Sequence, residues 1–367
     1  MAGVEDDADG WAALGLYDPE APFADDRLAT LRYLTARGAT TEDLRAGVSG
    51  GNLPAVMAEL ARRRPGCTLE ELSARSGVSL PEARQLLRAA GLGDPAPDDA
   101  SFVDADIETF RLGAAAVELF GLESTLQTTR VIGAALASIA DAALTNFGQT
   151  VGVSPAPAGR ELELTETTDV ANRLLFGAIP GILGAVFVHH ADAATRRAVT
   201  TGAAATSDLT VGFLDLVGST AMAERLSPTE LGRAISGFER HATEQLTACD
   251  GRVVKTIGDE VMFVGTDAAR ACEVALDLAR QVADDPVLPR LRGALAAGPL
   301  VRGYGDFYGP VVTTAARAVK LAEPGTVLVT EEVRRRADSS VLTFGPLGEQ
   351  VLRGFDRPVA LFRVERP

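Results

Sequence analysis

The C-terminal half of the chain contains the stretch Gly251-Arg-Val-Val-Lys-Thr-Ile-Gly-Asp-Glu-Val-Met-Phe-Val264, which decides the fold of that half. Two apolar, β-branched runs flank a polar turn from Ile257 to Glu260, a pattern typical of a β-hairpin. Asp259 lies on the turn and Lys255 lies four residues before it. Only two of the chain's 35 lysine and arginine residues are lysines. Because an ammonium and a guanidinium bind partners differently, this lysine indicates either a specific site or a chance lysine on a polar turn.

A second apolar run, Val211-Gly-Phe-Leu-Asp215, predicts a buried strand that ends in an aspartate. A small, hydroxyl-bearing turn follows it and leads into a helix, and its free backbone N–H groups are suited to phosphate. The residues that we expect to bind phosphate are Val217, Gly218, Ser219 and Thr220. Asp215 could hold Mg²⁺ against those phosphates or simply cap the helix.

The hairpin places an aspartate where it can reach the end of the strand that carries Asp215. Two carboxylates beside a phosphate-binding turn predict a two-metal site of the kind used in phosphoryl chemistry. The sequence contains neither GxxxxGK(S/T) nor GxGxxG, which disfavours the common nucleotide-binding folds.

A third motif runs from Arg302 to Arg317 and places Asp306 before an aromatic residue and a glycine. Thr313 and Arg317 are four residues apart on the helix that we expect to follow, so they share one helical face. Arg317 is either a surface residue or a group that neutralises charge developing on a triphosphate.

The 367 residues are enough for two or three domains. Residues 1–190 show helical apolar spacing throughout, whereas strands and helices alternate from residue 208 to residue 367. We therefore predict an all-α N-terminal domain (1–190), a linker or switch helix (191–207) and an α+β C-terminal domain (208–367). The most apolar run, Leu174 to Val188, is shorter than the roughly 20 residues that a membrane span needs. It predicts a buried core helix and no transmembrane segment.

Residues 68–90 resemble a helix-turn-helix, with capping boxes at both helix starts. A DNA-binding regulator is therefore an alternative function. The acidic residues that follow this segment and the net charge of −15 at pH 7 argue against nucleic acid as a partner. Three widely spaced cysteines and the lack of a signal pattern favour a soluble, cytoplasmic protein with reduced thiols.

The three C-terminal motifs, with the closing run from Val351 to Arg363, closely resemble the class III nucleotidyl cyclase catalytic domain over about residues 208–365. The resemblance implies a ferredoxin-like βαββαβ core that acts as a head-to-tail homodimer. It also implies conversion of ATP to 3′,5′-cyclic AMP and pyrophosphate.

The resemblance assigns roles residue by residue. Asp215 and Asp259 match the aspartates that hold two Mg²⁺ or Mn²⁺, and Leu216 falls in the same metal site. Lys255 and Asp306 match the pair that reads adenine, since an ammonium donates to N1 and a carboxylate accepts from the N6 amino group; GTP is the poorer candidate. Arg317 matches the transition-state arginine, and Arg353 is a looser match to a triphosphate-binding residue.

Thr313 departs from the family pattern, because most active members have asparagine at this position. If the lost amide contact strengthens in the transition state, turnover should fall by roughly 10- to 1000-fold. The sequence is consistent with two hypotheses: a slow cyclase, or a cyclase-like nucleotide sensor that has lost turnover.

The helical half resembles the N-terminal regulatory domains of actinobacterial cyclases, some of which are autoinhibitory, respond to acidity and bind fatty acids. The resemblance implies a regulatory role and makes a fatty acid or other lipid a candidate ligand. His189 and His190 lie where the last apolar helix meets the linker. Histidine changes charge between about pH 5 and 8, so this pair predicts either a pH-dependent joint or two solvated helix-end residues.

Overall fold

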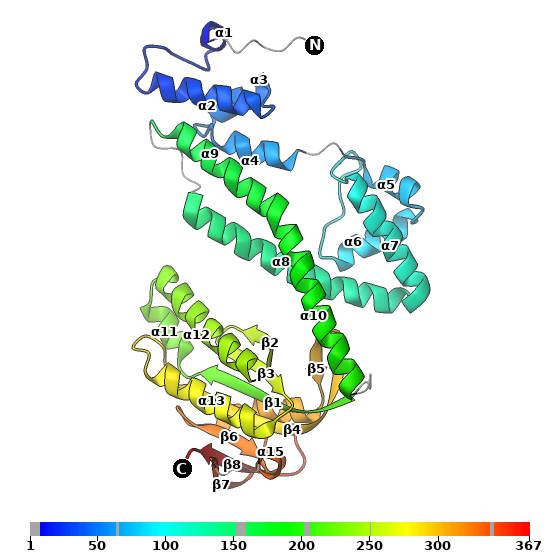
Figure 1. Ribbon diagram of the computed structural model, residues 1–367, viewed down its shortest axis with the longest axis vertical. Helices are drawn as coiled ribbons and strands as arrows, with labels where there is room; N and C mark the ends of the chain where they lie inside the picture. The colour runs from blue at the N-terminus through cyan, green and yellow to red at the C-terminus, as the bar shows by residue number, and fades with distance from the viewer. Residues whose placement is uncertain (1–7, 64–65, 152–158, 202–205, 250, 338–340) are drawn as a thin grey trace. The chain divides into compact units, whose positions relative to one another are not determined.

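The structure, a computed structural model, describes residues 8–63, 66–151, 159–201, 206–249, 251–337 and 341–367. The chain divides into two compact units, residues 1–196 and 197–367. Figure 1 shows a helical N-terminal unit and a C-terminal unit built on a β-sheet, as predicted. Residues 202–205 of the predicted linker lie outside the described residues, between the last helix of the first unit and the first strand of the second.

The N-terminal unit contains two buried apolar clusters, one among α1–α4 and one among α5–α8. The helices of this unit are α1 (Ala8–Ala13), α2 (Ala24–Ala36), α3 (Thr41–Ser49), α4 (Ala55–Arg62), α5 (Leu69–Ser76), α6 (Leu80–Ala89), α7 (Asp104–Phe120), α8 (Leu122–Val151), α9 (Glu161–Asn172), the π-helix η1 (Arg173–Ala178) and α10 (Ile179–Thr201).

The predicted helix pair within residues 68–90 forms as α5 and α6. The Thr68 and Ser79 hydroxyls accept from the third backbone N–H of each helix, so both predicted capping boxes are confirmed. Gly77 ends α5 with φ of 78°, which favours glycine. On α6, Arg88 pairs with Asp94, so this arginine is already occupied by a carboxylate.

The prediction that Leu174–Val188 is a buried core helix is wrong for this chain. Phe187 is 70% exposed, and Leu174 and Val188 are each 57% exposed. By length and composition, the described helical run Glu161–Arg196 could cross a membrane, and none of its most apolar window is buried. Apolar spacing identifies a helix but not the surface that covers it, which is why burial was predicted wrongly.

The C-terminal unit is built on an eight-stranded sheet whose main order is β2-β3-β1-β4-β6-β8-β7, with β5 paired to β4. The strands are β1 (Thr206–Leu216), β2 (Arg252–Ile257), β3 (Glu260–Gly265), β4 (Leu291–Gly303), β5 (Asp306–Tyr308), β6 (Val327–Thr330), β7 (Thr343–Gln350) and β8 (Val359–Glu365). The helices are α11 (Ser219–Arg225), α12 (Pro228–Ala248), α13 (Ala268–Ala283), α14 (Pro310–Ala318), η2 (Val319–Leu321) and α15 (Glu331–Arg336).

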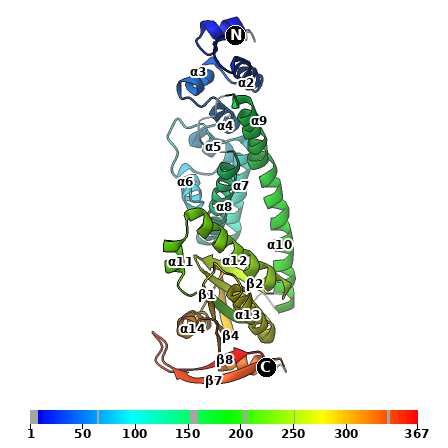
Figure 2. The ribbon, with the colours of Figure 1, turned by 90° about the vertical axis from the view of Figure 1, so that its left-hand side faces the viewer.

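The order β2-β3-β1-β4, with its helical connections between β1 and β2 and between β3 and β4, confirms the predicted βαββαβ core. The pairs β1–β3, β1–β4 and β2–β3 are antiparallel, whereas β6 adds parallel to β4. Figure 2 shows α12 and α13 on one side of this sheet and α14 on the other.

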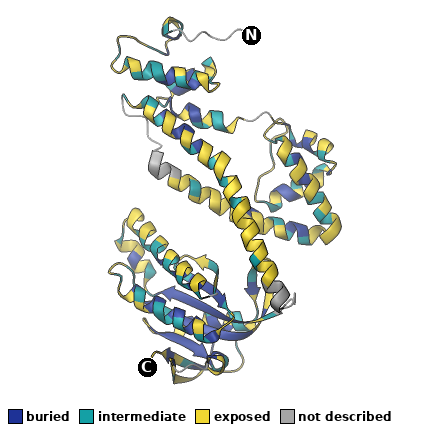
Figure 3. Ribbon diagram, in the orientation of Figure 1, coloured by how far each residue is buried: buried dark blue, intermediate teal, exposed yellow. Residues whose placement is uncertain are grey.

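The central strands are buried on both faces. Along β1, Val211 and Phe213 join the cluster under α14, while Leu214 and Leu216 join the cluster under α12 and α13. Gly212 is required by close packing, because a Cβ there would lie 2.2 Å from the Phe263 ring. Figure 3 shows the buried centre of the sheet and the mostly exposed surface of α10.

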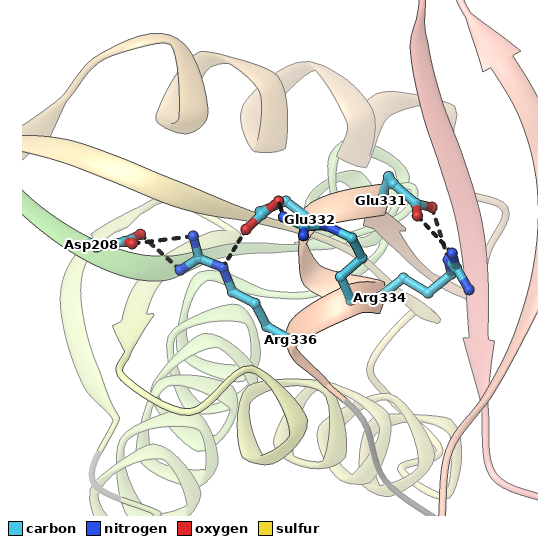
Figure 4. A network of polar contacts seen from close by, with 6 residues as sticks. Asp208, Glu331, Glu332, Arg334 and Arg336 are labelled. Carbon is cyan, nitrogen blue, oxygen red and sulfur yellow. Dashed lines mark hydrogen bonds and ion pairs between the residues drawn. The ribbon is translucent and has the colours of Figure 1, made fainter.

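A network of ion pairs ties α15 to the start of β1 (Figure 4). Arg336 contacts Asp208 and Glu332, each at 2.7 Å, and Arg334 contacts Glu331 at 2.6 Å. Hydrogen bonds to Asp208 and then Glu332 raise the pKa of Arg336. Of these pairs, Arg336–Asp208 joins α15 to the strand that leads to Asp215.

Candidate functional site

The hairpin brings two of the predicted carboxylates to the same edge of the sheet. β2 ends at Ile257 and β3 begins at Glu260, so Gly258 and Asp259 form the turn. Gly258 has a φ of 64°, which other residues adopt at a cost. Asp215 stands opposite Glu260 in the β1–β3 register, and the Leu216 N–H donates to the Asp259 carbonyl at 3.3 Å. Asp215 and Asp259 therefore lie on adjoining segments.

Asp215 is only 5% exposed and is held by two cations. Its Oδ2 accepts from the Arg292 guanidinium, with Nε at 2.7 Å and Nη2 at 2.6 Å. Its Oδ1 lies 3.2 Å from Lys320 Nζ, which also contacts Glu260 Oε2 at 2.8 Å. A buried carboxylate is costly unless it is paired, and these contacts supply the pairing.

Lys320 experiences opposing effects on its pKa. Burial lowers the pKa, but hydrogen bonds and charge from Glu260 and Asp215 outweigh that effect, so the pKa is raised. The lysine is therefore a charged ammonium at neutral pH.

The donor set at this edge fits a hard divalent cation whose remaining ligands come from a substrate. Within the described part of the chain, no cluster of three or more histidine, cysteine, aspartate or glutamate residues is arranged to hold a metal alone. Mg²⁺ commonly takes one or two carboxylates and completes its shell with phosphate oxygens and water. Asp215 and Asp259 match that mode, and the ammonium beside Asp215 shows that a cation is accommodated there.

Lys255 and Asp306 meet as predicted partners. Lys255 on β2 contacts Asp306 on β5, with Nζ 2.5 Å from Oδ2. The second oxygen of Asp306 accepts from the Phe307 N–H at 2.8 Å, which fixes the carboxylate. Phe307 is buried under Arg252 and Arg302, whose guanidinium carbons lie 5.3 and 5.9 Å from the ring centre. β5 is thus anchored while the Lys255 side chain stays 40% exposed.

The outer face of α14 carries Thr313 and Arg317, both exposed, while its inner face is buried. The Thr313 hydroxyl donates to the Gly309 carbonyl at 3.2 Å, within its own helix. Arg317 has no ion-pair partner among the described residues, so its guanidinium is available to a ligand.

The other predicted residues take varied positions. The Val217 N–H donates to the Arg290 carbonyl at 2.9 Å, so this amide is already used. Gly218 is the N-cap of α11 and receives no side-chain cap, and Ser219 and Thr220 open the helix. Arg353 is exposed between β7 and β8, and among the described residues no hydrogen bond or ion pair joins it to another predicted site residue. His189 and His190 are exposed on α10 of the other unit.

The sequence reasoning missed two residues of this edge, Arg292 and Lys320. Arg292 stands opposite Asp215 in the β1–β4 register, and that pairing of distant strands is invisible in the sequence. Lys320 could have been found, because it is the chain's other lysine. Lys255 contacts the Asp306 carboxylate, and Lys320 contacts the Glu260 carboxylate.

The family model described as the adenylate and guanylate cyclase catalytic domain matches residues 202–364. An adenylate cyclase of Glutamicibacter nicotianae is 31% identical over 314 residues, 78% of this chain and 75% of that relative. The chain belongs to the adenylate cyclase family. The cyclase is also 30% identical over 363 residues to a Mycobacterium tuberculosis protein named pH-sensitive adenylate cyclase, covering 93% of this chain and 88% of the relative.

A solved structure of an adenylyl cyclase from P. aeruginosa is similar to part of this chain. It covers 44% of this chain and 95% of its own, with 21% identity and a TM-score of 0.41. The class III cyclase resemblance stated from the motifs is thus confirmed by the family model and by the curated relatives.

Proposed function

We propose that this cyclase converts ATP to 3′,5′-cyclic AMP and pyrophosphate. The observation that carries the proposal is the Lys255–Asp306 pair, which offers a cationic donor beside a carboxylate acceptor. Adenine presents an acceptor at N1 next to a donor at N6, so the pair is complementary to that edge. Guanine presents the reverse order and would meet mismatched groups. Curated relatives named adenylate cyclase support the same substrate.

Asp215 and Asp259 are the proposed ligands of two Mg²⁺ or Mn²⁺ ions, with Leu216 contributing from the main chain between them. The divalent cations would supply Lewis acidity at the phosphate and ribose oxygens. Gly218, Ser219 and Thr220 would face the phosphates from the start of α11, beside Val217. Arg353 is the proposed contact to the far end of the triphosphate.

In the proposed reaction the ribose 3′-oxygen attacks the α-phosphorus in line. A bond forms between O3′ and the α-phosphorus, the bond from that phosphorus to the bridging oxygen breaks, and pyrophosphate leaves with the electron pair. The 3′-hydroxyl proton passes to solvent. Arg317 would neutralise the charge that grows on the phosphoryl oxygens, because its guanidinium forms no ion pair within the described part of the chain.

We propose a head-to-tail homodimer in which each site takes its metal aspartates from one protomer. Lys255, Asp306 and Arg317 would come from the other. The exposure of Arg317 and the partial exposure of Lys255 in the single chain support this arrangement, because both groups are accessible to a second copy.

Base recognition is tested by comparing ATP with GTP in the wild type and in Lys255→Gln. A hydrogen bond to a charged group contributes about 1.5–3 kcal/mol, so kcat/KM for ATP should fall roughly 10- to 100-fold while the value for GTP changes little. Arg335→Gln, on α15, is the matched control. An unchanged ratio of ATP to GTP in Lys255→Gln would contradict the assignment.

A nucleotide-binding sensor without turnover is the second candidate. The observation that favours it is the Thr313 hydroxyl, which is engaged by the Gly309 carbonyl of its own helix. Binding of ATP with no cyclic AMP formed under Mn²⁺ would support this reading and reject the first.

For the N-terminal unit we propose a regulatory role, with residues 191–207 as the connecting switch and acidity or a lipid as the signal. The similarity to a relative named pH-sensitive supports acidity, and the exposed apolar surface of α10 supports a lipid. Replacing His189 and His190 with asparagine should flatten the dependence of cyclase rate on pH; an unchanged profile would reject the histidine role.

We place the protein in the cytoplasm, where ATP is available and the three free cysteines stay reduced.

A further inference from the structure

Lys320 is the second lysine of a chain that otherwise uses arginine, and it faces the carboxylates proposed to hold metal. Its ammonium lies between Glu260 at 2.8 Å and Asp215 at 3.2 Å. The lysine belongs to η2, directly after the helix that carries Arg317, and its carbonyl accepts from Arg292 Nη1 at 3.4 Å. Its backbone is therefore fixed at the site, and its ammonium is held there by the two ion pairs.

The two partners of this ion pair differ in freedom. The side chain of Asp215 is 7% exposed and that of Lys320 is 50% exposed, so the lysine can swing towards solvent while the aspartate stays. The shorter contact of the ammonium is to Glu260, which is not among the proposed metal ligands. A flexible stem with a single charged point can leave one carboxylate without losing the other, whereas a planar guanidinium that bridges two oxygens cannot.

Local charge favours a further cation at this edge. The described groups here are the carboxylates of Asp215 and Glu260 and the cations Arg292 and Lys320, and Asp259 adds a third acidic residue on the adjoining turn. A divalent ion that binds Asp215 would meet the Lys320 ammonium at the Oδ1 oxygen that the lysine now occupies. Two cations compete for one oxygen, and like charges repel each other at such distances.

We propose that Lys320 is a positioning residue that acts as a displaceable counter-cation of the metal site. It neutralises Asp215 when no divalent ion is bound, yields Oδ1 when one binds, and remains with Glu260. The lysine thus sets how much free divalent metal the cyclase requires. The inference rests on the proposed function, because it takes Asp215 as a metal ligand.

The test measures Mn²⁺ binding to the full chain without nucleotide and at low ionic strength. The electron paramagnetic resonance signal of free Mn²⁺ reports how much of the metal is bound. The Asp215→Asn variant measures the background of Mn²⁺ that binds elsewhere on this acidic chain. The variants are Lys320→Gln, which removes the charge, and Lys320→Arg, which keeps it. The control is Arg335→Gln, which removes an arginine paired with Glu332 on α15. Melting temperatures in chelator check that each variant is folded.

We expect Lys320→Gln to lower the Kd for Mn²⁺ by about two- to tenfold. Mn²⁺ then no longer has to break a partly exposed ion pair or overcome repulsion from the Lys320 ammonium. Lys320→Arg should not bind more tightly than the wild type, and Arg335→Gln should match it. An equal or weaker affinity in Lys320→Gln would overturn the role of Lys320 alone. Wild-type binding that does not differ from Asp215→Asn would overturn the metal site together with this inference.

Discussion

The two units of the cyclase use apolar residues in opposite ways. In the C-terminal unit the apolar residues of the central strands are buried on both faces, and polar groups are concentrated at the strand ends. In the N-terminal unit, large apolar side chains along η1 and α10 stay exposed in the single chain, among them Leu174 and Phe187. A closed core positions the charges of a site rigidly, whereas an uncovered apolar helix is a surface that another body can contact.

The largest expected effect comes from a matched pair of phenylalanines, one in each unit. Phe238 on α12 is fully buried, so Phe238→Ala should lower the free energy of unfolding of the C-terminal unit by about 3–5 kcal/mol. Phe187 on α10 is 70% exposed, so Phe187→Ala should change stability by less than about 0.5 kcal/mol. Urea unfolding of the full chain measures both. An equal loss in the two variants would break the comparison, because it would mean that α10 is covered.

The second prediction separates rate from stability within the C-terminal unit. Thr313→Asn, on the exposed face of α14, should raise kcat about tenfold or more, because an amide reaches further than a hydroxyl held by Gly309. The melting temperature should not change. The same substitution combined with Arg317→Ala should lose the gain. A kcat that stays at the wild-type value would show that Thr313 does not limit turnover.

A polar anchor in the N-terminal unit gives the third prediction. Hydrogen bonds from Arg63 hold the pKa of Asp43 far below its usual range, and the Asp43 carboxylate also accepts from the N–H of Thr40, the N-cap of α3. A carboxyl whose folded pKa is depressed contributes stability above its unfolded pKa, and that stability is lost as the pH falls.

Asp43→Asn should therefore destabilise the N-terminal unit by about 1–2 kcal/mol near pH 7. The difference from the wild type should shrink as the pH falls below about 4, where the unfolded carboxyl takes up its proton. Urea unfolding at several pH values measures the difference. A gap that stays constant with pH would refute the ionic role of Asp43.

The smallest effect is expected at the network on α15. Arg336→Gln removes contacts to Asp208 and Glu332 that are partly exposed to solvent, so it should cost at most about 1 kcal/mol. The loss should diminish in high salt. A loss of stability as large as that of Phe238→Ala would mean that the network stabilises the C-terminal unit more than its exposure implies.

The sequence was most informative where local chemistry determines local structure. The hairpin around Gly258, the strand ending in Asp215 and the capping boxes at Thr68 and Ser79 all follow from neighbouring residues, and each was predicted. Contacts between residues on distant strands and helices were not predicted. Arg292 meets Asp215 only because β4 lies beside β1 in the sheet.

The exposure of α10 was missed for a related reason. An apolar run such as Leu174–Val188 has the same composition whether protein, lipid or a second chain covers it. Lys320 is different, because its rarity was visible in the sequence. Only the fold shows that it faces the same carboxylates as the proposed metal.

In the proposed cyclase, Asp215 and Asp259 at the strand ends carry cyclic AMP synthesis. The most direct measurement is cyclic AMP formed from ATP and Mn²⁺ by the purified full chain, compared with Asp259→Asn. Asp259 lies on the hairpin turn and has no ion-pair partner among the described residues, so this variant should fold and melt like the wild type. We predict cyclic AMP from the wild type and a loss of about 100-fold or more in the variant. No cyclic AMP from the wild type, or an undiminished rate in Asp259→Asn, would contradict the account.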